Sequence, residues 1–190
     1  MKKLAALLGA CLLLTACGST PAPPGQNLNR VETSTSAPTA DPAAVRWMDG
    51  FCSAVHGYRE RTNQEVRPAQ PPPKTVAESQ RAISAMLGGI AARTGEAAGK
   101  LTALPPAPVP LGDAVRQALV TKFTKAHDRA TEAKATLDRA KPGNEASQAP
   151  AVKAVQQAQQ DIDGAYDPIS AVKESPELML AAATAPGCKA

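Results

Sequence analysis

Apolar residues after position 41 recur three and four positions apart, which is the spacing of one helix face. Thr75 and Glu78 begin one such stretch as a capping-box pattern, in which each side chain accepts a hydrogen bond from the other residue's backbone. Its apolar face is formed by Ile83, Leu87, Ile90, Ala97, Leu101 and Leu104. The prolines between residues 105 and 110 end the pattern, because proline lacks the amide donor and clashes inside a helix. We therefore predict a long helix that begins after Thr75 and ends at this proline run.

Two further periodic stretches follow. The first begins at Asp113, ends before Pro142–Gly143 and has the apolar face Val115, Leu119, Phe123, Ala126, Ala130, Ala133, Leu137 and Ala140. The second begins after Pro150, with the inward positions Val152, Val155, Ala158, Ile162, Ala165, Ile169 and Val172. Asp167–Pro168 predicts a break or kink in it, because the residue before a proline disfavours helical backbone.

Helices are also predicted at both ends of this region. Asp41 as cap and Pro42 as first residue open one that frays before Pro68, and Ser175–Pro176 opens a short one that ends at Pro186. The first has inward positions Val45, Met48, Cys52 and Val55, flanked by Trp47, Phe51 and Tyr58. No segment alternates with period two over a useful length. The pattern predicts an all-α fold, an antiparallel bundle of four main helices plus a short C-terminal helix.

The first forty residues have a different pattern. Two lysines precede an apolar run from Leu4 to Leu14, and Leu14-Thr15-Ala16-Cys17 ends it. This layout is that of an export signal and resembles the lipobox of bacterial lipoproteins, in which the cysteine is lipidated and becomes the new N-terminus. The run is shorter than the roughly 18 residues of a membrane-spanning helix. We predict a lipoprotein signal peptide over residues 1–16 and a lipid on Cys17.

Cys11 also fits a loose lipobox, but cleavage before it would shorten the apolar region below the roughly 7 to 15 residues that export needs. Residues 17–40 are rich in Pro, Ser, Thr and Gly and lack apolar periodicity. Such a segment buries too little surface to offset its ordering entropy, which predicts a disordered tether. Residues 41–190 then form one helical domain.

Charge and composition exclude some partners. The net charge is +4, and loss of Lys2 and Lys3 with the signal leaves +2. This near-neutral balance argues against nucleic-acid binding. Aromatic residues are 3% of the chain and alanine dominates the apolar residues, so we expect a thin core of closely packed helices.

The four cysteines allow a prediction by elimination. Cys11 leaves with the signal and Cys17 carries the lipid, so Cys52 and Cys188 remain as a pair in an oxidising compartment. We predict a disulfide between them that closes the bundle. The alternative is two buried free thiols.

The ends of this domain resemble a group of small actinobacterial secreted proteins and lipoproteins. The resemblance rests on Trp47-Met48-Asp49-Gly50-Phe51-Cys52 and on Ala185-Pro186-Gly187-Cys188. It covers these two motifs and the signal, while the middle of the chain matches by helical character alone. It implies a disulfide-closed helical domain, and no biochemical activity is established for the group.

Catalytic and metal-binding patterns are sparse. His56 and His127 have no carboxylate or cysteine at ligand spacing, so we expect ordinary surface or flank residues and predict neither metal nor cofactor. Asp161 and Asp163 point in different directions on a helix and are expected on a solvated face. Four glycines between residues 88 and 99 do not form a phosphate loop, and they indicate a close helix contact or a local break.

The stretch beginning at Asp113 carries interleaved charges, which are typical of a solvated face. Its basic residues are Arg116, Lys122, Lys125, Arg129, Lys134 and Arg139. A weaker alternative is attraction of this helix to anionic headgroups or wall polymers.

Three functions remain open. We favour a non-catalytic module, anchored to the extracytoplasmic face of the cell membrane through Cys17, that binds an envelope protein or a cell-wall component. The alternatives are a carrier of lipid or another apolar ligand, which requires a cavity, and an enzyme with an unfamiliar site.

Overall fold

The computed structural model describes residues 38–65 and 71–189. The signal peptide, Cys17 and most of the predicted tether lie outside these residues. The described part is all-α, as predicted, and its α-helices are α1 (Pro42–Glu65), α2 (Val76–Thr102), α3 (Pro110–Arg139), α4 (Gln148–Asp161), α5 (Pro168–Val172) and α6 (Pro176–Thr184). A short 3₁₀ turn, η1 (Glu145–Ser147), precedes α4, and a second one, η2 (Pro186–Cys188), follows α6. None of the helices in these ranges combines the length and the hydropathy of a membrane-spanning segment.

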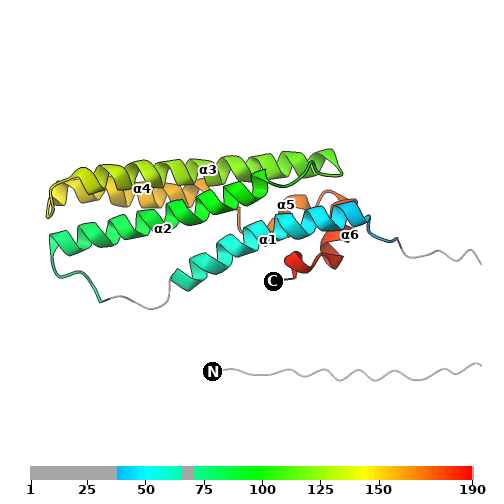
Figure 1. Cartoon of the computed structure of the whole chain (residues 1–190), viewed down its shortest axis with the longest axis horizontal. Helices are drawn as coiled ribbons and strands as arrows, with labels where there is room; N and C mark the ends of the chain where they lie inside the picture. The colour runs from blue at the N-terminus through cyan, green and yellow to red at the C-terminus, as the bar shows by residue number, and fades with distance from the viewer. Residues whose placement is uncertain (1–37, 66–70, 190) are drawn as a thin grey trace, which may run out of the picture. The chain divides into compact units, whose positions relative to one another are not determined.

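Helices α2, α3 and α4 form an antiparallel bundle (Figure 1). The predicted capping box is present at the start of α2, where Thr75 Oγ1 accepts from the Glu78 amide at 3.1 Å and Glu78 Oε2 accepts from the Thr75 amide at 3.2 Å. At the same end of the bundle, the buried Gln80 amide donates to the carbonyls of Leu137 and Ala140. Gln80 therefore joins the first turns of α2 to the last turn and C-cap of α3, where the carbonyls lack the usual amide partner four residues further on.

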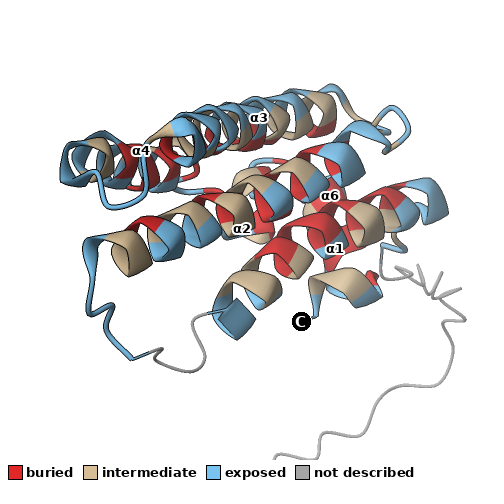
Figure 2. Ribbon diagram, turned by 60° about the vertical axis from the view of Figure 1, so that its left-hand side comes forward, coloured by how far each residue is buried: buried red, intermediate tan, exposed pale blue. Residues whose placement is uncertain are grey.

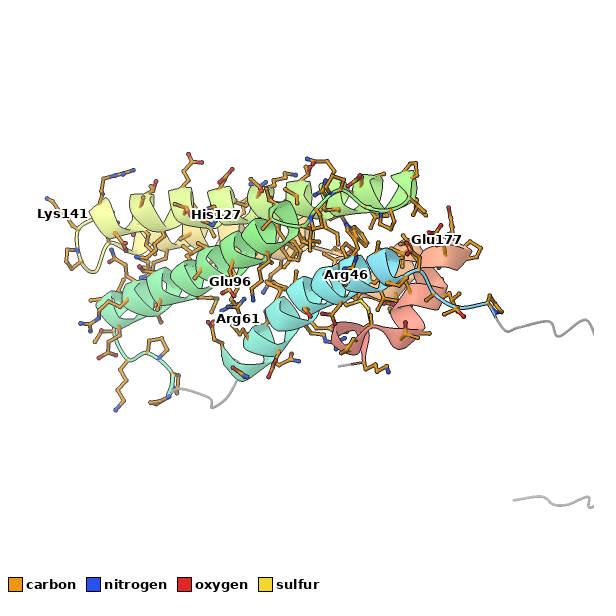
Figure 3. The ribbon with its side chains drawn as sticks, turned by 45° about the vertical axis from the view of Figure 1, so that its right-hand side comes forward. Arg46, Arg61, Glu96, His127, Lys141 and Glu177 are labelled. Atoms are coloured by element: carbon orange, nitrogen blue, oxygen red, sulfur yellow. A yellow bond between two sulfur atoms is a disulfide. The ribbon has the colours of Figure 1, made fainter. Side chains whose placement is uncertain are left out.

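Helix α1 lies beside the C-terminal half of α2 in a staggered antiparallel arrangement (Figure 1). Two ion pairs, Arg61–Glu96 and Glu65–Arg93, join the two helices near the end of α1. Figure 3 shows Arg61 and Glu96 between them. Gly89 of α2 makes room for this contact, because a Cβ there would lie 2.7 Å from Glu65 Oε2.

The rest of α1 is enclosed more fully than its sequence predicts. Trp47, Phe51 and Tyr58 were expected on a flank, but each is at most 3% exposed. The expectation was wrong because α5, α6 and η2 cover a second side of α1, so two faces of the helix are buried (Figure 2). Trp47 also donates from Nε1 to the Pro105 carbonyl at 3.2 Å.

The C-terminus is bound to α1 as predicted, through a disulfide between Cys52 and Cys188. Hydrogen bonds reinforce it, since the Gly187 amide donates to Asp49 Oδ1 at 2.7 Å and His56 Nδ1 donates to the Gly187 carbonyl at 2.8 Å. A Cβ at position 187 would lie 2.5 Å from the Asp49 carbonyl oxygen, so this approach requires glycine.

Two helices begin earlier than predicted. Helix α3 starts at Pro110 rather than Asp113, and α4 starts at Gln148 rather than after Pro150. Proline is compatible with the first turn of a helix, where its missing amide would have no intrahelical partner. Pro110 and Pro150 therefore lie inside the first turns of α3 and α4, and neither helix waits until after its proline to begin. Val152 was expected to face inward but is 42% exposed, and Ala151, Ala154, Val155 and Ala158 form the buried face of α4.

Candidate functional site

A surface cleft of about 620 Å³ lies at the C-terminal end of α4 and the turn that follows it. It is lined by Gln156, Gln159, Gln160, Asp163 and Tyr166, all of which are exposed. Within the described residues, the side chains of the three glutamines have no hydrogen bond or ion pair. Their amides are therefore available to a ligand.

Helix geometry explains why these glutamines share the cleft. Positions 156, 159 and 160 are three and four residues apart, so their side chains lie on one face of α4. The opposite face carries Ala154, Val155 and Ala158, which pack in the core. The glutamine face is thus directed to solvent by the burial of the alanine-rich face.

The turn after α4 is held in place by basic residues of α3. Asp161 accepts from Lys125 Nζ at 2.8 Å and from Arg129 Nε at 2.7 Å. Lys122 Nζ donates to the Asp163 carbonyl at 2.5 Å. Gly164 then takes a φ of 72°, in the left-handed region that glycine adopts without steric cost, and reverses the chain toward Tyr166.

The prediction that Asp161 lies on a solvated face is therefore wrong. Its side chain is only 8% exposed and faces α3. Asp163 is exposed as expected. Burial raises the pKa of Asp161, but the hydrogen bonds from Arg129 and Lys125 outweigh that effect and hold the pKa below its usual value. The carboxylate thus stays ionised and anchors the turn at neutral pH.

We expect Asp161→Asn to lower the free energy of unfolding by about 2 kcal/mol at pH 7, because two cations lose a charged acceptor. The lowered pKa means that the carboxylate stabilises the fold above the ordinary aspartate pKa of about 3.9 and ceases to do so as the pH falls below it. Urea unfolding at pH 7 and at roughly pH 3 should therefore show a difference between variant and parent that shrinks in acid. Asp163→Asn is the matched control, and an equal loss in both variants would contradict the assignment.

The Tyr166 ring packs on the Tyr58 ring, which in turn packs on the Phe123 ring. The centroid of the Tyr166 ring lies 6.0 Å from that of Tyr58, and Tyr58 lies 5.0 Å from Phe123 in a tilted arrangement favoured by aromatic pairs. Burial, together with the neighbouring Tyr166, raises the pKa of Tyr58 to about 12, so this phenol stays neutral. Tyr166 is 38% exposed, whereas Trp47, Phe51, Tyr58 and Phe123 are buried. The one exposed aromatic ring of the described residues therefore lies at the cleft.

A second cleft, of about 530 Å³, lies between the start of α2 and the end of α3. Its polar residues bond to one another, since Ser84 Oγ donates to Asp138 Oδ1 and Lys134 Nζ donates to both Ser84 Oγ and Asp138 Oδ2. Hydrogen bonds from Lys134 and then Ser84 hold the pKa of Asp138 below its usual value. These groups are engaged with each other, unlike the glutamines of α4.

Of the two histidines, His56 is buried rather than on the surface or a flank, whereas His127 is half-buried as a flank residue, and each makes a hydrogen bond between elements. His56 is 8% exposed and donates to η2, and His127 Nδ1 donates to the Ala91 carbonyl at 2.8 Å (Figure 3). Gly95 permits the second contact, because a Cβ there would lie 2.8 Å from His127 Nδ1. Helix α2 has no break, so close contact is the correct meaning of Gly89 and Gly95; nothing in the structure explains Gly99. In the described ranges, no three His, Cys, Asp or Glu side chains form a group that could hold a metal.

The basic residues of α3 are used within the fold. Each of the six has a hydrogen bond or ion pair; Lys125 and Arg129 contact Asp161 at the end of α4, and Lys122 contacts the turn that follows it. Sequence reasoning missed the glutamine cleft. The available signal was a helix face with glutamines at positions 156, 159 and 160, uncharged and followed by one of only two tyrosines in the chain.

No protein family, curated protein or solved structure matches this chain.

Proposed function

We propose that this chain is the precursor of a bacterial lipoprotein, anchored through Cys17 to the extracytoplasmic face of the cell membrane, and that its helical domain is a non-catalytic binding module. The glutamine and tyrosine cleft on α4 is its binding site. The partner is a component of the cell wall or another envelope molecule.

The observation that carries the binding role is the cleft itself. Unpartnered amides lie on the last turns of α4, and an exposed ring lies just after the turn that three α3 side chains hold in place. The backbone of such a binding site is already in place before a ligand arrives, so only its side chains have to be ordered. The Cys52–Cys188 disulfide supports export, because disulfides persist in oxidising compartments.

The anchor is tested by replacing Cys17 with alanine in cells of the native host. We expect the parent protein in the membrane fraction, and the Cys17→Ala variant unlipidated by mass spectrometry and displaced from that fraction. Cys11→Ala is the matched control and should leave lipidation unchanged. Lipidation that persists in Cys17→Ala would overturn the anchor.

The binding role is tested by in-cell crosslinking from the cleft. A photoreactive amino acid placed at Gln159 should give a reproducible adduct with one envelope component, while the same group at Gln117, an exposed glutamine of α3, should not. Adducts of equal pattern from both positions would count against a specific site.

The cleft between α2 and α3 favours a second candidate, a carrier of an apolar ligand. Ala77, Ala85 and Pro142 contribute apolar surface to it, and its volume lies within the range of roughly 300–1,000 Å³ of small-molecule sites. Native mass spectrometry of protein released from membranes would distinguish the two, because a carrier should retain a ligand mass that Ala85→Arg removes.

A further inference from the structure

We infer that the cleft on α4 takes a neutral oligosaccharide, with Tyr166 under a sugar ring and the glutamine amides on its hydroxyls. This inference names the ligand of the binding site proposed above and therefore rests on that proposal. Three features of the cleft carry it: the hydrogen-bonding groups, the supported ring and the local charge.

The hydrogen-bonding groups match hydroxyls. A sugar hydroxyl is both a donor and an acceptor, and a glutamine amide offers two donors on nitrogen and an acceptor oxygen. Three such amides line the cleft without partners in the described residues, and the Asp163 carboxylate adds two acceptors beside them. Planar amides of this kind can bond to neighbouring hydroxyls of one ring.

The exposed ring supplies the apolar contact. One face of a pyranose is formed by C–H groups, and burying such apolar surface against an aromatic ring is favourable. Tyr166 is held in position by the Tyr58 ring, which in turn packs on the fully buried Phe123. The Tyr166 ring therefore rests on an aromatic side chain of the core and keeps part of its surface in solvent.

The charges near the cleft favour a neutral ligand. Lys125 and Arg129 are paired with Asp161, and Lys122 donates to the Asp163 carbonyl. The cleft's own lining contains one carboxylate and no cation. An anionic polymer would thus meet a negative group with no free cation in the lining, whereas a neutral glycan meets groups that can bond to it. The volume of about 620 Å³ is sufficient for more than one ring.

The test uses the intact lipoprotein in a detergent without sugar headgroups and saturation-transfer NMR of soluble ligands. The probes are the β-1,4-linked tetramer of N-acetylglucosamine, maltotetraose and, as an anionic comparison, glycerol phosphate. We expect transfer to ring protons of at least one tetrasaccharide and none to glycerol phosphate. Transfer to neither sugar, or to glycerol phosphate instead, would overturn the ligand class.

Variants then localise the binding. Tyr166→Ala should weaken it about tenfold and Gln159→Ala about three- to tenfold, corresponding to loss of one ring contact or one hydrogen bond. Tyr166→Phe keeps the ring and should bind within about threefold of the parent, and Gln117→Ala should bind equally. Circular dichroism checks that each variant is folded, and Gln159→Ala changes only an exposed side chain. Sugar binding that survives both Tyr166→Ala and Gln159→Ala would place the site elsewhere.

The outcomes separate this inference from the proposed function. If no sugar binds but crosslinks from Gln159 still identify one envelope component, the binding module stands and the ligand is of another class. If the sugar binds but Cys17→Ala does not alter lipidation, the glycan site stands and the anchor is wrong.

Discussion

Replacing Cys52 and Cys188 together with alanine is expected to lower the free energy of unfolding by about 3–5 kcal/mol. The bridge joins residues separated by 136 positions, and closing so long a loop removes much of the conformational entropy of the unfolded chain. Since small domains are stable by about 5–15 kcal/mol, this single bond accounts for a large share of the total. We expect the C-terminal turn to detach from α1 before the bundle unfolds.

The measurement is urea denaturation followed by circular dichroism, in the presence and absence of a reductant. The parent under reducing conditions should resemble the double variant, and the double variant should not respond to the reductant. This comparison separates loss of the bond from the change of a fully buried side chain at position 52. A double variant as stable as the oxidised parent would contradict the prediction.

Phe123→Ala is expected to cost about 3–5 kcal/mol, because its ring is fully buried and its removal leaves a cavity. The effect should be at the upper end of that range, since alanines form much of the surrounding core and have few side-chain atoms with which to fill the space. The substitution also removes the ring on which Tyr58 packs, so the platform beneath Tyr166 is lost with it.

Phe123→Leu is the matched control, and it should cost less than half as much because most of the volume is retained. Denaturation midpoints at constant slope give both values. If Phe123→Ala destabilised the domain by less than about 1 kcal/mol, the ring would not be packed as the structure places it.

The predicted helices correspond closely to those observed because the signals that define a helix are local. Thr75 and Glu78 form the capping box within four residues of each other, and Asp41, Asp167 and Ser175 accept hydrogen bonds at the starts of α1, α5 and α6. The prolines between α2 and α3 mark the end of α2 for the same reason. The starts of α3 and α4 were predicted too late because proline, which ends a helix, also fits the first turn of one.

The burial of particular faces could not be predicted in the same way. Apolar spacing identifies one inward face, but α1 has two, because α6 and η2 return to cover it from the far end of the chain. Asp161 was likewise expected in solvent, and it is buried because α3 places Lys125 and Arg129 against it. Such contacts join segments more than thirty residues apart, and no local pattern records them.

The cleft on α4 is another feature that local sequence could not predict. Three glutamines on one helix face are visible in the sequence, but an uncharged polar face ordinarily indicates solvent exposure and no more. The glutamines form a candidate site only together with Tyr166. The position of the Tyr166 ring depends on Tyr58 of α1, which packs on Phe123 of α3.

Local sequence thus specified the helices, their caps and, through the count of cysteines, the pairing of Cys52 with Cys188. Backbone hydrogen bonds and capping act over a few residues, and two cysteines left over in an oxidising compartment can pair wherever they lie in the chain. Side-chain packing between distant helices specified which rings are buried, which carboxylate is paired and which amides remain free. The reason is that burial and screening of charge are properties of the whole surroundings of a group, and those surroundings exist only once the chain has folded.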